Sequence, residues 1–280
     1  MHKYIKITMT LLLLFSLFSC NSKTDDKITM TINTGALDIQ ETSTGTVSKD
    51  IFGQDFTQTV VGEKVSSGKL LGYYAHPKTE GNYPGIVMIH EWWGLNKEIK
   101  YMADLLANDG YNVFAIDLYD GQVADTTEKA MELSTKVREN GTGAIEKLSL
   151  AYDYLKNTQK STKVASLGWC FGGQQSLNLS LSKPLDATVI YYGNLVTDSE
   201  KLKTITGPVL GIFGEQDKSI SVESVNKFRD ALDKNGTKRE IHVYSGVGHA
   251  FANPTGNNYG KTQTQNAWKK TVAFLKENLK

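Results

Sequence analysis

Short, continuous apolar runs alternate with helical patterns from residue 86 onward, and this alternation constrains the fold most strongly. An apolar run of this length is typical of a strand buried on both faces, as in a parallel sheet covered by helices. The segments between the runs carry apolar residues at helical spacing. We therefore expect an α/β fold with a mostly parallel central sheet flanked by helices on both faces. The expected strands are residues 86–89, 113–116, 164–169, 187–191, 209–213 and 241–244.

The helices between these strands have recognisable ends. Asn96 is expected to cap a helix that ends at Gly110, and whose inward stripe is Ile99, Met102, Ala103, Leu105 and Leu106. Further helices are predicted over residues 126–137, 144–157, 172–181, 222–234 and 264–278. Ahead of the first buried strand, residues 54–61 and 69–76 predict an antiparallel pair around a Gly/Ser turn. With no internal repeat or interior linker, residues 53–280 are expected to form one domain.

The charge composition argues against a nucleic-acid partner. The chain has 31 basic and 30 acidic residues, and only Arg138, Arg229 and Arg239 are arginines. A net charge of +1 offers no continuous face for phosphates and few guanidinium groups for base reading. We expect a small-molecule partner instead.

The first 20 residues have the pattern of a bacterial lipoprotein signal. Lys3 and Lys6 precede an apolar block over residues 11–18, which is too short to span a membrane and is typical of a signal peptide over residues 1–19. Leu17-Phe18-Ser19-Cys20 resembles the bacterial lipobox, which implies lipidation of Cys20; the alternative is an ordinary cleaved signal. Residues 20–52 are predicted to be a polar tether. The expected location is extracytoplasmic, anchored to a bacterial membrane at its periplasmic face or at the cell surface.

One cysteine lies in a sequence suited to nucleophilic chemistry. Gly168-Trp169-Cys170-Phe171-Gly172 follows an expected strand and opens an expected helix, which is the nucleophile-elbow pattern with Cys in place of Ser. The glycines are required because larger side chains would collide in so sharp a turn. The helix N-terminus favours the thiolate. The alternative is that Cys170 is an inert, buried apolar residue.

A base and an acid follow this cysteine in the order that a catalytic triad requires. Asp217 lies in the loop after residues 209–213, and His249 lies in the loop after residues 241–244. The carboxyl ends of parallel strands meet at one edge of a sheet, so the three side chains are expected to converge there. The alternatives are that Asp217 only caps the next helix, that Glu215 is the acid, or that His249 has no role.

The loop after residues 86–89 is the other informative strand end. It reads His90-Glu91-Trp92-Trp93-Gly94, and the amides of Trp92 and Phe171 are predicted to form an oxyanion hole. Glu91 would be repelled by a thiolate unless it is protonated or turned away; the alternative is a partly exposed salt bridge. The predicted substrate pocket is aromatic, and its candidate residues are Trp93, Tyr119, Trp169, Tyr192 and Phe251.

Together these motifs resemble the dienelactone hydrolase family. The resemblance covers about residues 68–278 and rests on His-Glu-Trp-Trp-Gly, Asp117-Leu118-Tyr119, the Cys170 elbow, Tyr191-Tyr192-Gly193, Gly214-Glu215-Gln216-Asp217 and Gly248-His249-Ala250-Phe251. It implies an α/β-hydrolase fold, a Cys170-His249-Asp217 triad, and a role for Glu91 in ionising the thiol. Family members that bind an anionic lactone use arginines, and the corresponding positions are Gly121 and Asn253 here. The resemblance therefore favours a neutral ester, lactone or thioester.

The predicted activity is hydrolysis of an ester or lactone through a covalent acyl-cysteine. We expect no cofactor and no metal, because His, Cys and Asp stand one per loop without close ligand spacing, and we expect a monomer. Two alternatives remain open: an inactive, surface-anchored binding module on a hydrolase fold, and a thioesterase or other acyl transferase.

Overall fold

The computed structural model describes residues 28–33, 36–41, 48–49, 52, 55–56 and 60–280. The described residues form an eight-stranded sheet in the order β12-β11-β10-β9-β7-β8-β6-β5. All neighbouring strands from β12 to β8 are parallel, whereas β6 and β5 are antiparallel to their neighbours. The strands are β5 (Val60–Ser67), β6 (Leu70–Pro77), β7 (Gly85–Ile89), β8 (Asn112–Ile116), β9 (Val164–Trp169), β10 (Ala187–Tyr191), β11 (Val209–Gly214) and β12 (Arg239–Tyr244).

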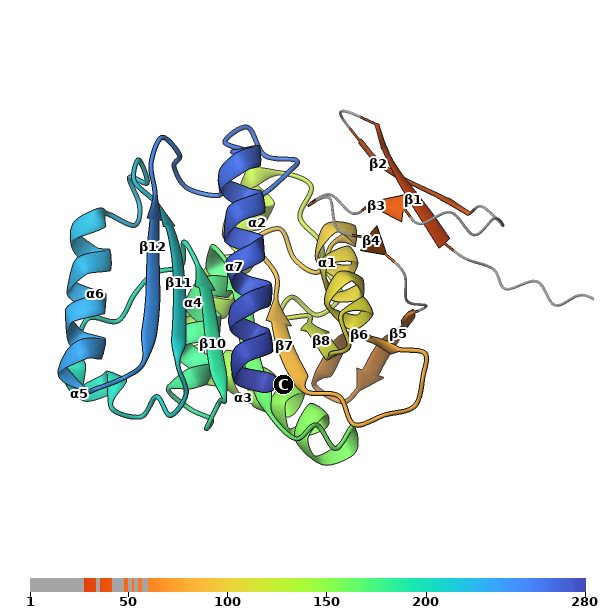
Figure 1. Cartoon of the computed structure of the whole chain (residues 1–280), viewed down its shortest axis with the longest axis horizontal. Helices are drawn as coiled ribbons and strands as arrows, with labels where there is room; N and C mark the ends of the chain where they lie inside the picture. Colours follow the sequence, from red (N-terminus) through yellow and green to blue (C-terminus); the bar gives the residue numbers. More distant parts are fainter. Residues whose placement is uncertain (1–27, 34–35, 42–47, 50–51, 53–54, 57–59) are drawn as a thin grey trace, which may run out of the picture.

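Helices cover both faces of this sheet, as the alternating pattern predicts. In Figure 1, α1 and α7 lie in front of the sheet, and α3 and α4 lie behind it. Buried residues of α1 and α7 pack on one face, those of α2 to α4 on the other, and α6 packs with α4. The helices are α1 (Lys97–Asn108), α2 (Thr127–Glu139), α3 (Gly141–Asp153), α4 (Phe171–Ser180), α5 (Ser199–Leu202), α6 (Val222–Lys234) and α7 (Lys261–Leu279), with a π-helical turn at Tyr154–Thr158.

Local signals in the sequence account for several of these elements. The Asn96 side chain accepts a hydrogen bond from the Ile99 amide at 3.1 Å, so Asn96 caps α1 as predicted. Gly110 follows this helix with φ of 86°, a conformation that favours glycine. The strands β7, β8, β9, β10 and β11 are buried along their whole length. Burial on both faces explains their continuous apolar runs.

The first antiparallel strand differs from the prediction. It was expected at residues 54–61, but β5 runs from Val60 to Ser67 and turns at Gly68 into β6. Ser66 and Ser67 have the composition of a turn, yet they pair with Leu71 and Leu70. Because β5 is an edge strand and mostly exposed, polar residues are tolerated along it.

The N-terminal part of the chain is described only in short pieces. Residues 1–19 and Cys20, the predicted signal and lipidation site, lie outside the described residues. Within the segment predicted to be a tether, β1 (Ile28–Asn33) and β2 (Ala36–Glu41) form an antiparallel hairpin. A second small pair joins β3 (Ser48–Lys49) to β4 (Asp55–Phe56).

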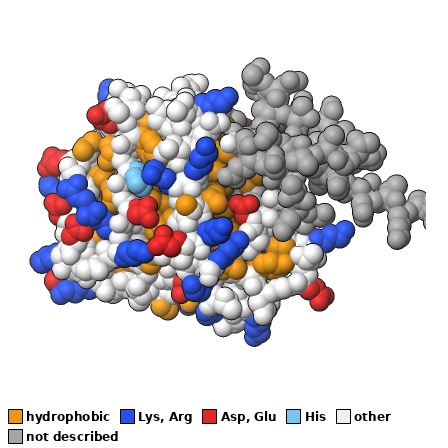
Figure 2. Space-filling view, in the orientation of Figure 1, with side chains coloured by type: hydrophobic (Ala, Val, Ile, Leu, Met, Phe, Trp, Pro, Cys, Tyr) orange, Lys and Arg blue, Asp and Glu red, His pale blue; other side chains and the backbone are white. Residues whose placement is uncertain are grey.

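The described surface agrees with the balanced charge composition. On the face seen in Figure 2, basic and acidic side chains are interspersed. Searching the described residues for a helix of sufficient length and apolarity to cross a membrane finds none.

Candidate active site

Four predicted site residues lie at the carboxyl ends of strands in the parallel part of the sheet. Cys170 follows β9, Asp217 follows β11 and His249 follows β12, while Glu91 follows β7. The sheet order brings these loops to one edge, because β7 to β12 run parallel with β10 between β9 and β11. Residues far apart in the sequence therefore meet.

The turn at Cys170 has the sharp geometry expected of a nucleophile elbow. Cys170 has φ of 53° and ψ of −115°, an unfavourable conformation for a residue with a side chain that costs about 1–3 kcal/mol. A Cβ atom on Gly168 would lie 2.1 Å from the Gly172 carbonyl oxygen. One on Gly172 would lie 2.3 Å from the Ile89 carbonyl oxygen. Both glycines are thus required by close backbone approach.

The sulfur, the imidazole and one carboxylate form a continuous chain of contacts. His249 Nε2 lies 3.1 Å from Cys170 Sγ, and His249 Nδ1 lies 2.8 Å from Asp217 Oδ2. Cys170 is a free, partly exposed cysteine, so it is not sealed in the core. Glu215 does not contact His249: it accepts hydrogen bonds from Ser245 and the Gly246 amide.

Backbone groups hold Asp217 in position. Its Oδ1 atom accepts hydrogen bonds from the amides of Ser219 and Ile220, at 2.8 and 3.0 Å. The cap of α6 is Ser221. Asp217 is therefore turned toward His249 rather than used as a helix cap.

The protonation of His249 follows from these contacts. Burial alone would lower the pKa of His249, but the hydrogen bonds to Asp217 and Cys170 outweigh it and raise the pKa to about 10. Burial likewise would raise the pKa of Asp217, but the hydrogen bonds from His249 and the Ile220 amide lower it overall. These contacts therefore favour the charged form of His249, whose ring lies between the Asp217 carboxylate and the Cys170 sulfur.

Glu91 lies beside this chain with partners of its own. Asn253 Nδ2 donates to Glu91 Oε2 at 2.7 Å, and the Tyr192 hydroxyl donates to Oε1 at 3.4 Å. Burial raises the pKa of Glu91 to about 7, although the hydrogen bond from Asn253 and the charge of His249 oppose this. Among the described residues Glu91 has no ion-pair partner, so the predicted alternative of a salt bridge is not observed.

The loop that carries Trp92 is fixed by a buried histidine. His90 Nδ1 donates to the Glu91 carbonyl at 2.6 Å, and its Nε2 accepts from the Leu118 amide at 3.2 Å. Burial lowers the pKa of His90, which keeps the ring neutral. In the described part of the chain the amides of Trp92 and Phe171 have no hydrogen-bond acceptor, so both donors are available to a ligand.

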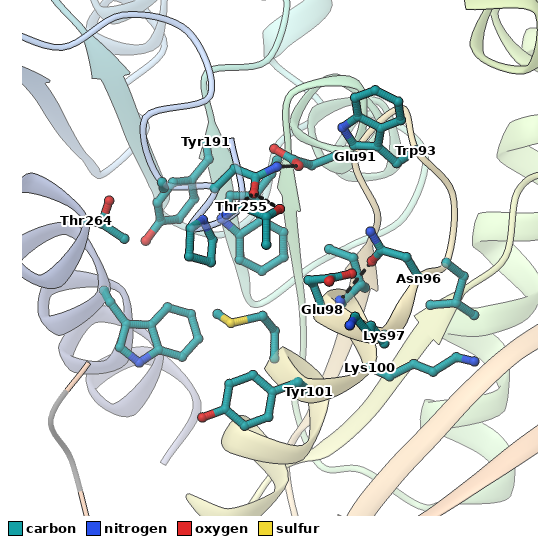
Figure 3. Close-up of a pocket in the computed structure, with 18 of the residues that line it drawn as sticks. Glu91, Trp93, Asn96, Lys97, Glu98, Lys100, Tyr101, Tyr191, Thr255 and Thr264 are labelled. Carbon is teal, nitrogen blue, oxygen red and sulfur yellow. Dashed lines mark hydrogen bonds between the residues drawn. The ribbon is translucent and has the colours of Figure 1, made fainter. Parts of the chain in front are cut away.

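A pocket of about 560 Å³ lies next to Glu91 (Figure 3). Three of the five predicted pocket residues line it, namely Trp93, Trp169 and Tyr192. Tyr119 and Phe251 do not. Tyr119 packs against Phe171 with ring centroids 5.7 Å apart, and its hydroxyl donates to the Trp92 carbonyl at 3.1 Å.

Phe251 has a different place from the one predicted. It is fully buried, with its ring 5.7 Å from that of Tyr192 and 5.4 Å from that of Tyr244. It therefore supports Tyr192 from behind and cannot touch a substrate. The sequence pattern around His249 predicts that Phe251 lies near the site, but it does not predict the direction in which the Phe251 side chain points.

Sequence reasoning missed two residues of this site. Asn253 was noted only as a position without arginine, yet it makes the shorter of the two hydrogen bonds to the Glu91 carboxylate. Phe52 lines the pocket, although it was assigned to the tether. No local sequence signal identifies either role. Across the described residues, no cluster of three or more His, Cys, Asp or Glu side chains is arranged to hold a metal ion.

Comparison with known proteins identifies the family. A sequence model of the dienelactone hydrolase family matches residues 70–279. The chain belongs to the dienelactone hydrolase family. Within this class it is a carboxylic ester hydrolase with the α/β-hydrolase fold, as predicted from the motifs.

Individual relatives agree with this assignment. The chain is 36% identical over 220 residues to "Protein usf" of Aquifex pyrophilus, covering 75% of this chain and 94% of that protein. It is 32% identical over 221 residues to a protein of Aquifex aeolicus named "Putative carboxymethylenebutenolidase", covering 76% and 95%. A crystal structure of a "Putative Dienelactone Hydrolase" from Klebsiella pneumoniae superposes with a TM-score of 0.65 at 22% identity, covering 78% of this chain and 99% of that one, which supports the fold.

Proposed function

We propose that this hydrolase cleaves a neutral ester or lactone through a Cys170-His249-Asp217 triad and a covalent acyl-cysteine. The observation that carries the proposal is the contact chain at the sheet edge, with Sγ to Nε2 at 3.1 Å and Nδ1 to the carboxylate at 2.8 Å. These distances match those needed for a nucleophile, its base and the group that orients the base.

Acylation begins with attack of the Cys170 thiolate on the carbonyl carbon of the substrate. As the carbon–sulfur bond forms, the carbonyl oxygen becomes negative and accepts hydrogen bonds from the amides of Trp92 and Phe171. Collapse of this intermediate breaks the carbon–oxygen bond. The leaving alkoxide takes the proton from Nε2 of His249, which becomes neutral.

Deacylation reverses the proton transfer. Neutral His249 removes a proton from water, and the water oxygen attacks the acyl carbon. The carbon–sulfur bond then breaks, the acid leaves, and the thiolate and the imidazolium are restored. Asp217 stabilises the imidazolium and fixes the ring orientation throughout.

Glu91 is proposed to assist ionisation of the thiol once a substrate is bound. Its carboxyl titrates near neutral pH and is held by Asn253 and Tyr192 rather than by a cation. A group that changes charge in this range can accept the proton of the Cys170 thiol when its own partners are disturbed, and can return that proton to the sulfur after deacylation.

The expected neutral substrate is consistent with the groups at positions 121 and 253. The Gly121 amide donates to Asp117, and the Asn253 amide donates to Glu91. Neither position supplies a guanidinium that could bind a carboxylate in bidentate fashion. A pair of p-nitrophenyl esters, one ending in a methyl group and one in a carboxylate, tests this: we expect a higher kcat/KM for the methyl member.

Alkylation tests the nucleophile. The chain has two cysteines, so in a Cys20→Ser variant Cys170 is the remaining thiol. Iodoacetamide should abolish hydrolysis of p-nitrophenyl acetate in proportion to alkylation, and Cys170→Ala should lower kcat by at least about 10³-fold. Hydrolysis that survives complete alkylation contradicts the mechanism.

We also propose that the chain is a monomer and is lipidated at Cys20 on an extracytoplasmic membrane face. The lipobox-like residues before Cys20 support the lipidation. Expression of the full chain in a bacterium should give a membrane-bound, lipid-labelled product, and Cys20→Ser should release it from the membrane fraction. A wild-type product without lipid label contradicts the proposal.

A further inference from the structure

The pocket beside Glu91 is lined mainly by apolar side chains of α1, α7 and the loops at the sheet edge. In Figure 3, Glu91 and Trp93 lie at one end and Tyr101 at the other, while Asn96, Glu98 and Lys100 lie along one side. Its apolar lining includes Leu95, Ile99, Met102, Trp169, Ala252 and Trp268. A pocket of about 560 Å³ with this lining suits an apolar chain rather than a polar ligand.

One wall of this pocket comes from outside the region shared with the family. Phe52 precedes the matched residues 70–279 and lies in the segment whose composition predicts a tether. Its side chain is only 6% exposed, and its ring stacks on that of Trp268 with centroids 4.7 Å apart and planes at 17°. Phe52 and Trp268 both line the pocket. Phe52 thus forms part of the pocket wall.

The pocket lies next to the proposed catalytic residues. Glu91 and Tyr192 belong to its lining, and the Tyr192 ring lies 5.3 Å from that of His249. Trp169, another lining residue, immediately precedes Cys170. Cys170 and His249 themselves are not lining residues, so an ester at the sulfur would extend past Glu91 and Tyr192 to enter the pocket.

We propose that this pocket binds the apolar chain of a neutral carboxylic ester, and that Phe52 determines the length of chain that it accepts. The inference rests on the proposed ester hydrolysis. Its physical basis is that each methylene transferred from water into an apolar pocket raises kcat/KM about 3- to 4-fold, until the chain meets a wall. Phe52 is then a specificity residue and takes no part in bond breaking.

Two substitutions of Phe52 should move the chain-length profile in opposite directions. Phe52→Ala removes the ring that closes the wall, so the best substrate should become longer by at least two methylenes. Phe52→Trp fills more of the pocket, so the best substrate should become shorter. The kcat/KM for p-nitrophenyl acetate should change less than that for the longer esters, because a short acyl group gains little from the pocket.

The measurement uses the full chain and two series of esters. One series varies the acyl chain of p-nitrophenyl esters from acetate to dodecanoate, and the other varies the alkyl chain of acetate esters, which shows which end of the ester enters the pocket. Phe228→Leu is the control, because Phe228 is fully buried in a separate cluster with α6 and does not line the pocket. This control should lower thermal stability without moving either profile.

A binding experiment separates this inference from the catalytic proposal. Three of the four tryptophans line the pocket, so methyl octanoate should change the intrinsic fluorescence of a Cys170→Ala variant, and Phe52→Trp in that background should weaken binding several-fold. Such binding without any ester turnover by wild type would refute the catalytic proposal alone. Ester turnover with both profiles unchanged by Phe52→Ala and Phe52→Trp, or with all esters reduced equally, would overturn the inference about Phe52.

Discussion

Replacing Glu91 with glutamine should stabilise the protein at alkaline pH but not at acid pH. Burial raises the pKa of this carboxyl from its ordinary 4.5 to about 7. The folded protein therefore binds the proton more tightly than the unfolded chain, so stability falls as pH rises from about 4.5 to about 7 and the loss persists above that range. One pKa unit corresponds to about 1.4 kcal/mol, so the ionised carboxylate costs the folded state about 3–3.5 kcal/mol.

The substitution avoids this cost without leaving a polar group unpaired. The glutamine amide oxygen can accept the hydrogen bond from Asn253, and its NH2 group can donate to the Tyr192 hydroxyl oxygen, which is also an acceptor. At pH 8 the variant should unfold roughly 5–10 °C above wild type in a calorimetric scan, whereas at pH 4.5 the two should agree. Glu80→Gln, at an exposed position before β7, is the matched control and should show no such difference. A gain for Glu91→Gln that is equal at both pH values, or absent at pH 8, would refute the reasoning.

Three other substitutions test the geometry of the site. Asp217→Asn should lower kcat by about 10⁴-fold, and because it removes a contact that raises the pKa of His249, the imidazole titration followed by NMR should move to lower pH. Gly168→Ala should destabilise the fold by several kcal/mol, because the added Cβ would lie 2.1 Å from the Gly172 carbonyl oxygen; a melting temperature equal to that of wild type contradicts this. Asn253→Ala removes a hydrogen bond that lowers the pKa of the Glu91 carboxyl, so this pKa should rise and the loss of stability that accompanies Glu91 ionisation should occur at higher pH. An unchanged dependence of the melting temperature on pH would exclude this effect.

Much of the fold could be predicted because its signals are local. The buried strands are continuous apolar runs, and α1 is capped by Asn96 and followed by Gly110, as the capping rules require. The positions of Cys170 and His249 could also be predicted. A sharp turn needs glycines at fixed spacing, and parallel strands bring their carboxyl ends together.

The remainder depends on contacts between distant parts of the chain. The exposed edge strand β5 carries serines that resemble a turn, and only its pairing with β6 identifies them as strand residues. The burial of Phe251 is decided by the rings of Tyr192 and Tyr244 that pack against it, and the place of Phe52 is decided by Trp268 on the last helix. Such long-range packing leaves no periodic trace in the sequence.

The central claim concerns the bond between substrate and sulfur, and intact-protein mass spectrometry after rapid acid quenching tests it most directly. Mixed with p-nitrophenyl acetate, the Cys20→Ser protein should gain one acetyl group within the first turnover, mapped to Cys170 by peptide analysis, and the Cys170→Ala protein should gain none. Burst release of nitrophenol without any acetylated cysteine, or full turnover by the Cys170→Ala protein, would contradict the account.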